Sequence, residues 1–256
     1  MHTRRALVRR PSPRLAEGLV THIERSEVDV ELAQQQWQGY VDALVAAGWE
    51  PHEVDAAADC PDSAFVEDTM VVYGDLAVIA RPGAPERRPE VTAAEEAVRA
   101  EGYRVAHIEA PGTLDGGDVL KHGGTVWVGQ GGRTNAEGIA QLRGLLAPMG
   151  ARVIACPLEK VLHLKSAVTA LPDGTVIGYE PLVDDPSIWG DRFLAVPEEA
   201  GAHVVLLGDD HVLMAASAPR TAALLHRRGL KVTRVDISEY EKLEGCVTCL
   251  SVRLRR

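Results

Sequence analysis

Residues 70–108 read MVVYGDLAVIARPGAPERRPEVTAAEEAVRAEGYRVAHI and contain the parts of one structural unit. Two short apolar runs meet at a Gly-Asp turn, which predicts a β-hairpin over 70–80. A loop over 81–89, rich in Pro, Gly and Arg, leads to a helix over 90–102, where small apolar residues recur three and four positions apart. The helix closes on a glycine, and 103–108 is a third strand. The stretch therefore predicts a ββαβ unit.

The same order of elements recurs along the chain. The second unit consists of a hairpin over 118–129, a helix over 135–149 and a strand over 152–155. The third consists of a strand over 163–170, a strand over 175–178 and an irregular helix over 192–199. The fourth consists of strands over 204–207 and 212–214, a helix over 218–228 and a strand over 231–235. Self-similarity with a period of roughly 50 residues indicates radial or stacked repetition.

Segments at the two ends of the chain supply the parts of a fifth unit. A strand over 5–9 and a helix over 30–47 lie at one end, and a final strand over 249–254 lies at the other. Pairing of the terminal strands would close a ring and leave no sheet edge exposed. We therefore predict an α/β fold of five ββαβ units in one domain, residues 1–256. An ordinary α+β sheet with helices on one face is the alternative.

Composition narrows the classes of function. The 256 residues carry a formal net charge of -10, with no continuous basic patch, so we expect no nucleic-acid partner. No apolar run approaches the ~20 residues of a membrane helix, and no apolar segment follows the N-terminal arginines as in a signal peptide. The four cysteines are too few for a secreted disulfide scaffold. We expect a cytoplasmic protein without a membrane partner, and a cationic small substrate fits its acidity.

Polar residues gather at related places in the units. They occupy 62–68 before the first complete hairpin, 113–118 before the second, 163–166 at the start of the third unit, and Cys249 at the start of the final strand. Each group is weak by itself; the Asp-Gly-Gly-Asp of 115–118, for example, is typical of a turn whose glycines adopt positive φ. In a ring, however, all four groups would face the centre.

Together these residues indicate nucleophilic catalysis by a cysteine. A thiolate is the reactive form of cysteine, so Cys249 needs a cationic neighbour or a base. His163 can fill that place and can donate a proton to a leaving group. Asp115 can orient the histidine or bind a cationic substrate.

The number of carboxylates indicates the kind of substrate. Hydrolysis of a neutral amide would not need Asp62, Glu67 and Asp68 in addition to Asp115. A planar guanidinium would, because its N–H groups match carboxylates in two-point hydrogen bonds. Arg87 and Arg133, in the loops, are natural partners for the carboxylate of an amino acid.

The motifs, taken in order, resemble those of the dimethylarginine dimethylaminohydrolases, which belong to the guanidine-modifying (pentein) superfamily. The resemblance spans nearly the whole chain. The matching segments are Phe65-Val66-Glu67-Asp68, Arg81-Pro82-Gly83-Ala84-Pro85 with Arg87-Arg88, Leu114-Asp115-Gly116-Gly117-Asp118-Val119-Leu120, Arg133-Thr134-Asn135, Leu162-His163-Leu164-Lys165-Ser166 and Thr248-Cys249-Leu250-Ser251.

The resemblance implies a five-bladed, pseudo-symmetric α/β propeller and a cysteine-dependent amidine hydrolase that converts Nω-methylated arginines to citrulline, without metal or cofactor. Cys249 would form a covalent thiouronium adduct, His163 would be the acid and base, and Asp115 would belong to the catalytic group. A homodimer is left open. Substrate-binding roles are implied for Leu19, Asp62, Glu67, Asp68, Arg87, Arg133, Ser166 and Leu243.

Two related activities fit less well. Arginine deiminases have His-x-Asp at the third group, whereas Lys165 stands two residues after His163 here. Deiminases and amidinotransferases are also longer. An arginine deiminase-like hydrolase, or another guanidine- or amidine-modifying enzyme, remains the alternative.

Cys246 and Cys249 leave three hypotheses open: a metal half-site, a redox dithiol, or one nucleophile with a bystander. A thioredoxin-type pair begins a helix, whereas this pair precedes an alternating strand, and no second Cys/His pair lies nearby at zinc spacing. We therefore predict that Cys246 is a bystander in the approach loop. Adventitious zinc on Cys249 and His163 stays open, as does a non-catalytic relative that binds arginine derivatives.

Overall fold

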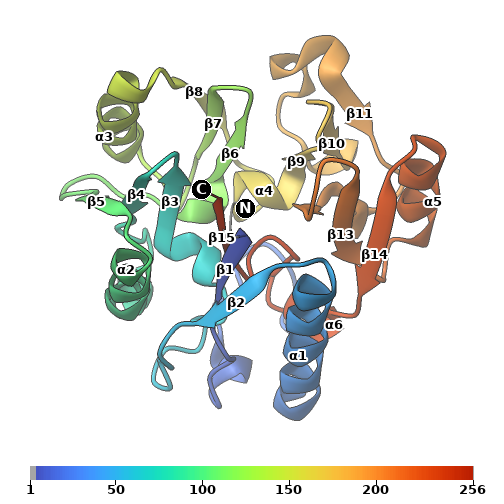
Figure 1. Ribbon diagram of the computed structural model, residues 1–256, viewed down its shortest axis with the longest axis horizontal. Coiled ribbons are helices and arrows are strands. Elements are labelled where there is room, and N and C mark those ends of the chain that lie inside the picture. Colours follow the sequence, from blue (N-terminus) through green and yellow to red (C-terminus); the bar gives the residue numbers. More distant parts are fainter. Residues whose placement is uncertain (1–3, 256) are drawn as a thin grey trace.

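The computed structural model describes residues 4–255, and these contain five three-stranded sheets. Each sheet has the same pairing: its middle strand is antiparallel to one neighbour and parallel to the other. The sheets surround the centre of the molecule (Figure 1). The mixed α/β class and the five units predicted from the sequence are confirmed.

The strands of four sheets follow one another along the chain. They are β3 (Met70–Tyr73), β4 (Leu76–Ile79) and β5 (Arg104–His107); β6 (Val119–His122), β7 (Thr125–Gln130) and β8 (Arg152–Pro157); β9 (Val168–Ala170), β10 (Val176–Gly178) and β11 (Phe193–Ala195); and β12 (Val205–Leu206), β13 (His211–Ala215) and β14 (Lys231–Val235).

The fifth sheet joins the two ends of the chain. β1 (Arg4–Val8) pairs antiparallel with β15 (Val252–Arg255) and parallel with β2 (Glu50–Glu53). The pairing that the sequence predicted between the terminal segments is therefore present, and β1 and β15 lie near the centre of the molecule (Figure 1).

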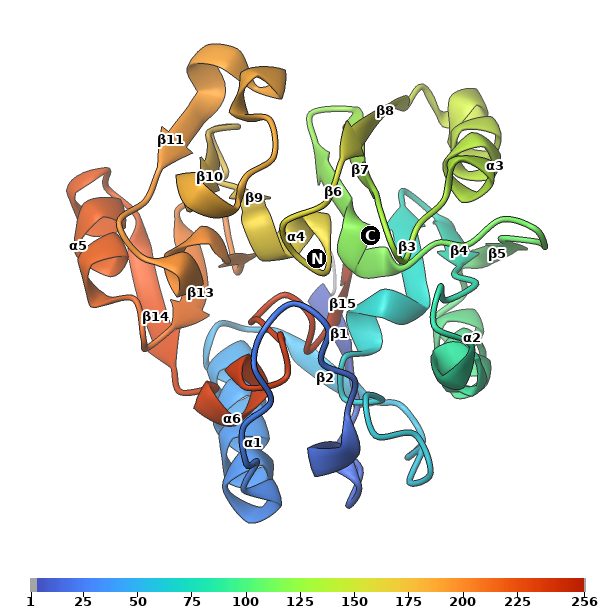
Figure 2. The ribbon, with the colours of Figure 1, turned by 180° about the vertical axis from the view of Figure 1, so that it is seen from behind.

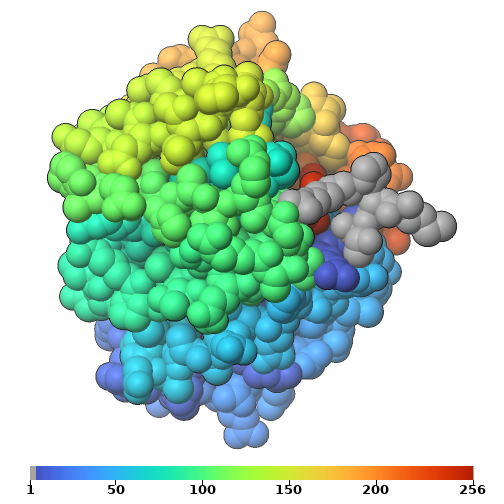
Figure 3. Space-filling view, turned by 60° about the vertical axis from the view of Figure 1, so that its left-hand side comes forward, coloured from blue at the N-terminus to red at the C-terminus, as the bar shows by residue number. Residues whose placement is uncertain are grey.

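Helices cross over between the second and third strands of four units. They are α1 (Val30–Ala46), α2 (Val91–Ala100), α3 (Ala136–Leu146) and α5 (Pro219–Arg227), and they lie on the periphery (Figure 1). Side chains fix where helices start: Asp29 accepts the Leu32 amide of α1, and Asn135 accepts the Gly138 amide of α3. Neighbouring units pack closely along the face shown in Figure 3. No helix of residues 4–255 combines the length and hydrophobicity required to span a membrane.

Three expected elements differ from the sequence prediction. Residues 163–170 are not one strand, because α4 (Leu164–Ala167) precedes β9. Residues 192–199 are not a helix, because β11 pairs in parallel with β10 and short 3₁₀ turns replace the crossover helix. The final strand begins at Val252 instead of 249. In each case, pairing or hydrogen bonding with a distant segment decides the conformation.

A buried apolar cluster holds the segment before β15. Cys246, Val247, Cys249 and Leu250 belong to the same cluster as Trp37, Tyr40 and Leu44 of α1. Tyr40 also shares a 2.7 Å hydrogen bond between its hydroxyl and that of Ser251. α6 (Ser238–Glu241), which the sequence analysis did not predict, packs against α1. The final turn therefore sits on a rigid helix, which fixes the position of Cys249.

Candidate active site

One small cavity brings together most of the predicted site. Eight of the eleven side chains line it: Leu19, Asp62, Asp68, Arg87, Arg133, His163, Leu243 and Cys249. They come from several units and from both ends of the chain. The remaining walls are Phe65, Leu162, Glu244 and Gly245, which the sequence analysis assigned no role although each adjoins a predicted residue or motif.

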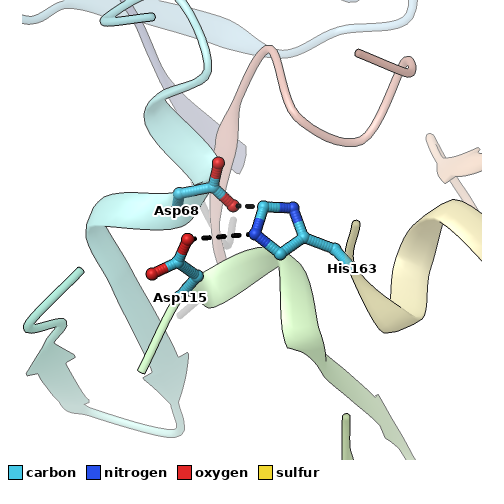
Figure 4. Close-up of side chains that lie close together, drawn as sticks. All are labelled: Asp68, Asp115 and His163. Carbon is cyan, nitrogen blue, oxygen red and sulfur yellow. Dashed lines mark hydrogen bonds and ion pairs between the residues drawn. The ribbon is translucent and has the colours of Figure 1, made fainter. Parts of the chain in front are cut away.

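His163 is the centre of the charged part of this cavity. It is buried, at 3% exposure, and its Nε2 lies 3.0 Å from a carboxylate oxygen of Asp115. Its Nδ1 lies 3.8 Å from a carboxylate oxygen of Asp68. Figure 4 shows both carboxylates directed at the imidazole ring. The ring is therefore held between two anions.

These anions decide the protonation of the ring. Burial lowers the pKa of His163, but the charges of Asp68, Asp115 and Asp118 outweigh burial and raise that pKa to about 9. Burial raises the pKa of Asp68, yet His163 and Arg87 lower it to about 2. At neutral pH the site therefore holds an imidazolium and an ionised Asp68.

Backbone amides hold the two carboxylates in place. Asp115 accepts the Gly83 amide at 2.9 Å, and Asp68 accepts the Gly117 amide at 2.9 Å. Asp118 supports the next turn by accepting the Leu164 amide at 3.0 Å. That bond satisfies the start of α4, which explains why the chain turns directly after His163.

Position 117 has room only for glycine. A Cβ there would lie 2.5 Å from the Asp68 carboxylate and 2.7 Å from Nδ1 of His163. Neither Gly116 nor Gly117 is among the residues with positive φ. The expectation that these glycines serve a positive-φ turn is therefore wrong, and close packing around His163 explains Gly117.

Cys249 lies in a turn before β15, instead of on the strand as predicted. It is 5% exposed, and its carbonyl accepts the Glu67 amide at 3.1 Å. Its sulfur lies 3.3 Å from that of Cys246, so the predicted bystander is in direct contact with the predicted nucleophile. This hydrogen bond, burial and the charge of Cys246 raise the pKa of Cys249 well above its usual range.

The segment 18–26 borders the cavity through Leu19. The Leu19 amide donates to both carboxylate oxygens of Asp62, at 3.1 and 3.2 Å. The amides of Thr21 and His22 donate to Glu244, at 2.6 and 2.8 Å. Figure 2 shows the blue N-terminal loop beside the red loop before β15. With the segment held in this way the cavity measures only about 10 Å³, roughly the space for one water molecule.

The two predicted arginines have different surroundings. Arg87 is fully engaged, with ion pairs to Asp68 at 2.6 Å and Glu90 at 2.8 Å. Arg133 is buried too, but its Nη1 has no hydrogen-bond partner among residues 4–255 and lies 3.9 Å from Asp115. A buried donor that makes no hydrogen bond is costly, so Arg133 is the better prepared of the two to receive an anionic ligand group.

Glu67 and Ser166 lie outside the cavity. The carboxylate of Glu67 pairs with Lys165 at 2.6 Å and with Arg253 at 3.0 Å, and it lines a separate cavity of about 300 Å³. Ser166 borders a third hollow, and its carbonyl is bonded to His203 at 2.7 Å. Neither side chain thus lines the cavity that contains Cys249, although the Glu67 amide is bonded to the Cys249 carbonyl.

Asp68, Asp115 and His163 are also grouped closely enough to hold a metal ion. Within residues 4–255, their ligand atoms lie within 4.8 Å of one another. Both ring nitrogens of His163 already face carboxylate oxygens, at 3.0 and 3.8 Å, and a metal ion would have to replace one of these contacts. The grouping therefore fits acid–base chemistry better than metal binding.

Comparison with known proteins identifies the family. No family model matches the chain. A curated dimethylarginine dimethylaminohydrolase of Streptomyces coelicolor is 65% identical over 255 residues, which cover 100% of this chain and 98% of that protein. The chain belongs to the dimethylarginine dimethylaminohydrolase family.

Solved structures of this family have the same fold. A dimethylarginine dimethylaminohydrolase in adduct with S-methyl-L-thiocitrulline, a histidine-to-glycine variant, is 33% identical with a TM-score of 0.92 and covers 99% of this chain and 100% of that one. A cysteine-to-serine variant of the Pseudomonas aeruginosa dimethylarginine dimethylaminohydrolase, in complex with citrulline, is 34% identical with the same TM-score and the same coverage. The resemblance predicted from the motifs is therefore confirmed at the level of family and fold.

Proposed function

We propose that this protein hydrolyses Nω-methylated arginines, both asymmetric dimethylarginine and monomethylarginine, to citrulline and dimethylamine or methylamine. The observation that carries the proposal is an imidazolium held between two carboxylates in the cavity that contains a buried cysteine. We propose that residues 1–256 act as one catalytic domain in the cytoplasm, with no metal or cofactor.

Binding would use the carboxylates and Arg133. Asp62 and Asp68 line the cavity and offer oxygens to a guanidinium, and the Nη1 of Arg133, which makes no hydrogen bond within residues 4–255, suits the α-carboxylate. Asp62 is occupied by the Leu19 amide, and the cavity is too small for an amino acid. Segment 18–26 would therefore have to move to admit the substrate, which would free Asp62.

The charges around Cys249 determine when this cysteine can act as a nucleophile. Without substrate, Cys249 stays a thiol because its pKa is raised by Cys246, burial and carboxylates. A guanidinium placed beside the sulfur would supply the missing positive charge and favour the thiolate. Cys249 would then attack the guanidino carbon. His163 would protonate the departing amine, which leaves a thiouronium adduct on sulfur.

The second half-reaction reverses the role of His163. After donating its proton, the neutral imidazole would take one from a water molecule that attacks the adduct carbon. Asp68 and Asp115 favour this step because they stabilise the imidazolium that forms. The intermediate would then expel the Cys249 thiolate and release citrulline.

A side-by-side assay tests the proposal. Citrulline is measured with dimethylarginine, monomethylarginine and arginine as alternative substrates for the purified protein. We expect the two methylated substrates to react and arginine to be a poor substrate, because the position two residues after His163 is Lys165, paired with Glu67, instead of a second carboxylate. Faster reaction with arginine would favour a deiminase-like activity, and no citrulline from any of the three would contradict catalysis.

The protonation of His163 gives a prediction about pH. We expect its imidazole to titrate near pH 9 in NMR spectra, compared with about 6.5 in an unfolded chain. The folded state binds this proton more tightly, so the resulting stabilisation is complete below about pH 6.5 and is lost as the pH rises through 9. Asp115→Asn should lower the pKa of the ring, because it removes the nearer charge. Titration of His163 near pH 6.5 in the wild type would contradict this account.

A methyl group at Gly117 should disable the site while leaving the fold intact. Gly117→Ala places its Cβ against Asp68 and His163, so the imidazole must shift. A misplacement of about 1 Å costs roughly 10²-fold in rate, and we expect a loss of kcat of that order. Gly144→Ala is the matched control, because nothing lies within 4 Å of that Cβ on α3, and it should keep full activity. Equal activity of the two variants would show that the packing at Gly117 is unimportant.

A further inference from the structure

A second thiol lies beside the predicted nucleophile. The sulfurs of Cys246 and Cys249 are 3.3 Å apart, and both cysteines are free. The Cys249 amide donates to the Cys246 carbonyl at 3.1 Å, which closes a four-residue turn. In such turns the outer Cα atoms lie less than about 7 Å apart, and disulfides span about 4.4–6.8 Å. The pair is therefore placed to form a bond with little movement of the backbone.

The surroundings of Cys246 favour a reactive thiolate. Its sulfur lies 3.3 Å from Cys249 and 3.2 Å from the Thr248 hydroxyl, both of which can donate a hydrogen bond to it. The hydrogen bond from Cys249 lowers the pKa of Cys246 to about 5, although burial opposes this. The two hydrogen bonds therefore stabilise a thiolate on Cys246, and its sulfur faces that of Cys249.

The other cysteines do not share these features. Burial raises the pKa of Cys156 to about 12, and burial also raises that of Cys60. Cys156 packs in the cluster of Trp127 and Leu158, away from the cavity. Selective chemistry at the Cys246–Cys249 pair is therefore expected.

We propose that Cys246 and Cys249 form a reversible disulfide when a hydroperoxide reaches the site, and that this modification switches the enzyme off while protecting its nucleophile. The effect on activity rests on the proposed function. The disulfide itself does not, because its formation needs only the two sulfurs and the oxidant.

The chemistry balances in two steps. The Cys249 thiol passes its proton to the Cys246 thiolate 3.3 Å away, and the Cys249 thiolate formed in this way attacks one oxygen of the hydroperoxide. The O–O bond breaks, and protonation of the other oxygen yields an alcohol or water, leaving a sulfenic acid on Cys249. The Cys246 sulfur then attacks the Cys249 sulfur, and the hydroxide leaves as water with the proton from Cys246. In sum, two thiols and one hydroperoxide give a disulfide, an alcohol or water, and one further water. A dithiol reductant restores both thiols and becomes a disulfide itself.

The position of the pair explains why this would protect the enzyme. Cys249 lines the cavity, whereas Cys246, buried at 2% exposure, does not. An oxidant that enters would meet Cys249 first, and without a second thiol the sulfenic acid can proceed to sulfinic and sulfonic acids, which dithiols do not reduce. In a reducing cytoplasm such a disulfide would be transient, as redox-sensing disulfides there are.

Peptide mass spectrometry with hydrogen peroxide as the probe tests the proposal. Trypsin releases both cysteines in one peptide, residues 243–253. After treatment of the full-length protein, we expect that peptide to lose two hydrogen atoms in mass, activity to fall by more than tenfold, and dithiothreitol to restore both. Citrulline bound in the cavity should slow the change, because it covers Cys249.

Cys246→Ser is the critical variant, and Cys60→Ser is the control. In Cys246→Ser we expect oxygen addition at Cys249 and at least a tenfold smaller recovery of activity with dithiothreitol, whereas Cys60→Ser should behave like the wild type. Oxygen addition without a disulfide in the wild type, or equal recovery of wild type and Cys246→Ser, would overturn the proposal. If the protein releases no citrulline, the proposed function fails, and the peptide mass still decides the disulfide.

Discussion

Cys249→Ser is expected to lower citrulline formation from dimethylarginine by roughly 10⁴-fold or more, since removal of a covalent nucleophile costs about this much or more. A serine hydroxyl in this cavity would have to lose a far less acidic proton than a thiol, beside the carboxylates of Asp68 and Glu67 that oppose a new anion. Substrate binding should be largely kept, because the carboxylates and Arg133 remain. The measurement is steady-state citrulline release together with substrate affinity by calorimetry.

Cys246→Ser is the matched control for that substitution. A serine hydroxyl keeps a small polar group beside Cys249 and Thr248, so we expect most of the activity to remain. Each variant replaces one sulfur atom by an oxygen atom, and the two positions are three residues apart. Equal loss in both would show that catalysis requires the pair of sulfurs and would argue against a single nucleophile.

Replacement of His163 by glycine is expected to lower the rate by roughly 10²–10⁴-fold, the usual contribution of general acid–base catalysis. The variant lacks the group that protonates the departing amine and later activates water. Asp68 and Asp115 would also face each other without the cation between them. Thermal unfolding measured in parallel will separate loss of catalysis from loss of structure.

A substrate with a different leaving group shows whether His163 acts as a general acid or only supports the structure. S-methyl-L-thiocitrulline expels a thiol, which needs less protonation than an amine. We therefore expect His163→Gly to form a covalent adduct on Cys249 with this compound, while its reaction with dimethylarginine stays slow. Added imidazole should restore part of the rate. Equal impairment with both compounds, and no rescue, would indicate that His163 only supports the fold of the site.

Local patterns were sufficient to predict most of the fold. The hairpin of β3 and β4, with its Gly-Asp turn, and helices such as α2, which ends before Gly102, carry their signals in neighbouring residues. The positive φ of Gly74 and Gly102 agrees with those signals. Pairing of β1 with β15 was also predictable, because each terminal segment lacked the rest of a unit.

Elements that depend on distant partners were not predictable. α4 starts where Asp118 accepts the Leu164 amide, and β11 exists because it pairs with β10. The sequence around 192–199 has the composition of an irregular helix, and no local pattern shows that the third unit lacks its crossover helix. β2 and α6 are short and polar, so they also escaped prediction.

In the site, too, local patterns predicted some features, and features that depend on distant contacts were missed. The spacing of motifs in the repeat placed Cys249, His163 and Asp115 near the centre, because equivalent positions of a ring face the same way. The direction of individual side chains could not be inferred: Glu67 and Asp68 are adjacent, yet only Asp68 lines the cavity with Cys249. The contact of Cys246 with Cys249 depends on the turn that the final segment adopts, and the sequence analysis predicted a strand starting at 249.

The most direct test of the central claim is to trap the covalent intermediate. The protein is mixed with dimethylarginine, quenched in acid within the first turnover, and the peptide of residues 243–253 is analysed by mass spectrometry. We predict a thiouronium adduct on Cys249 that forms and decays at rates consistent with citrulline release. Citrulline production without an adduct on Cys249, or with one on another residue, would contradict the account.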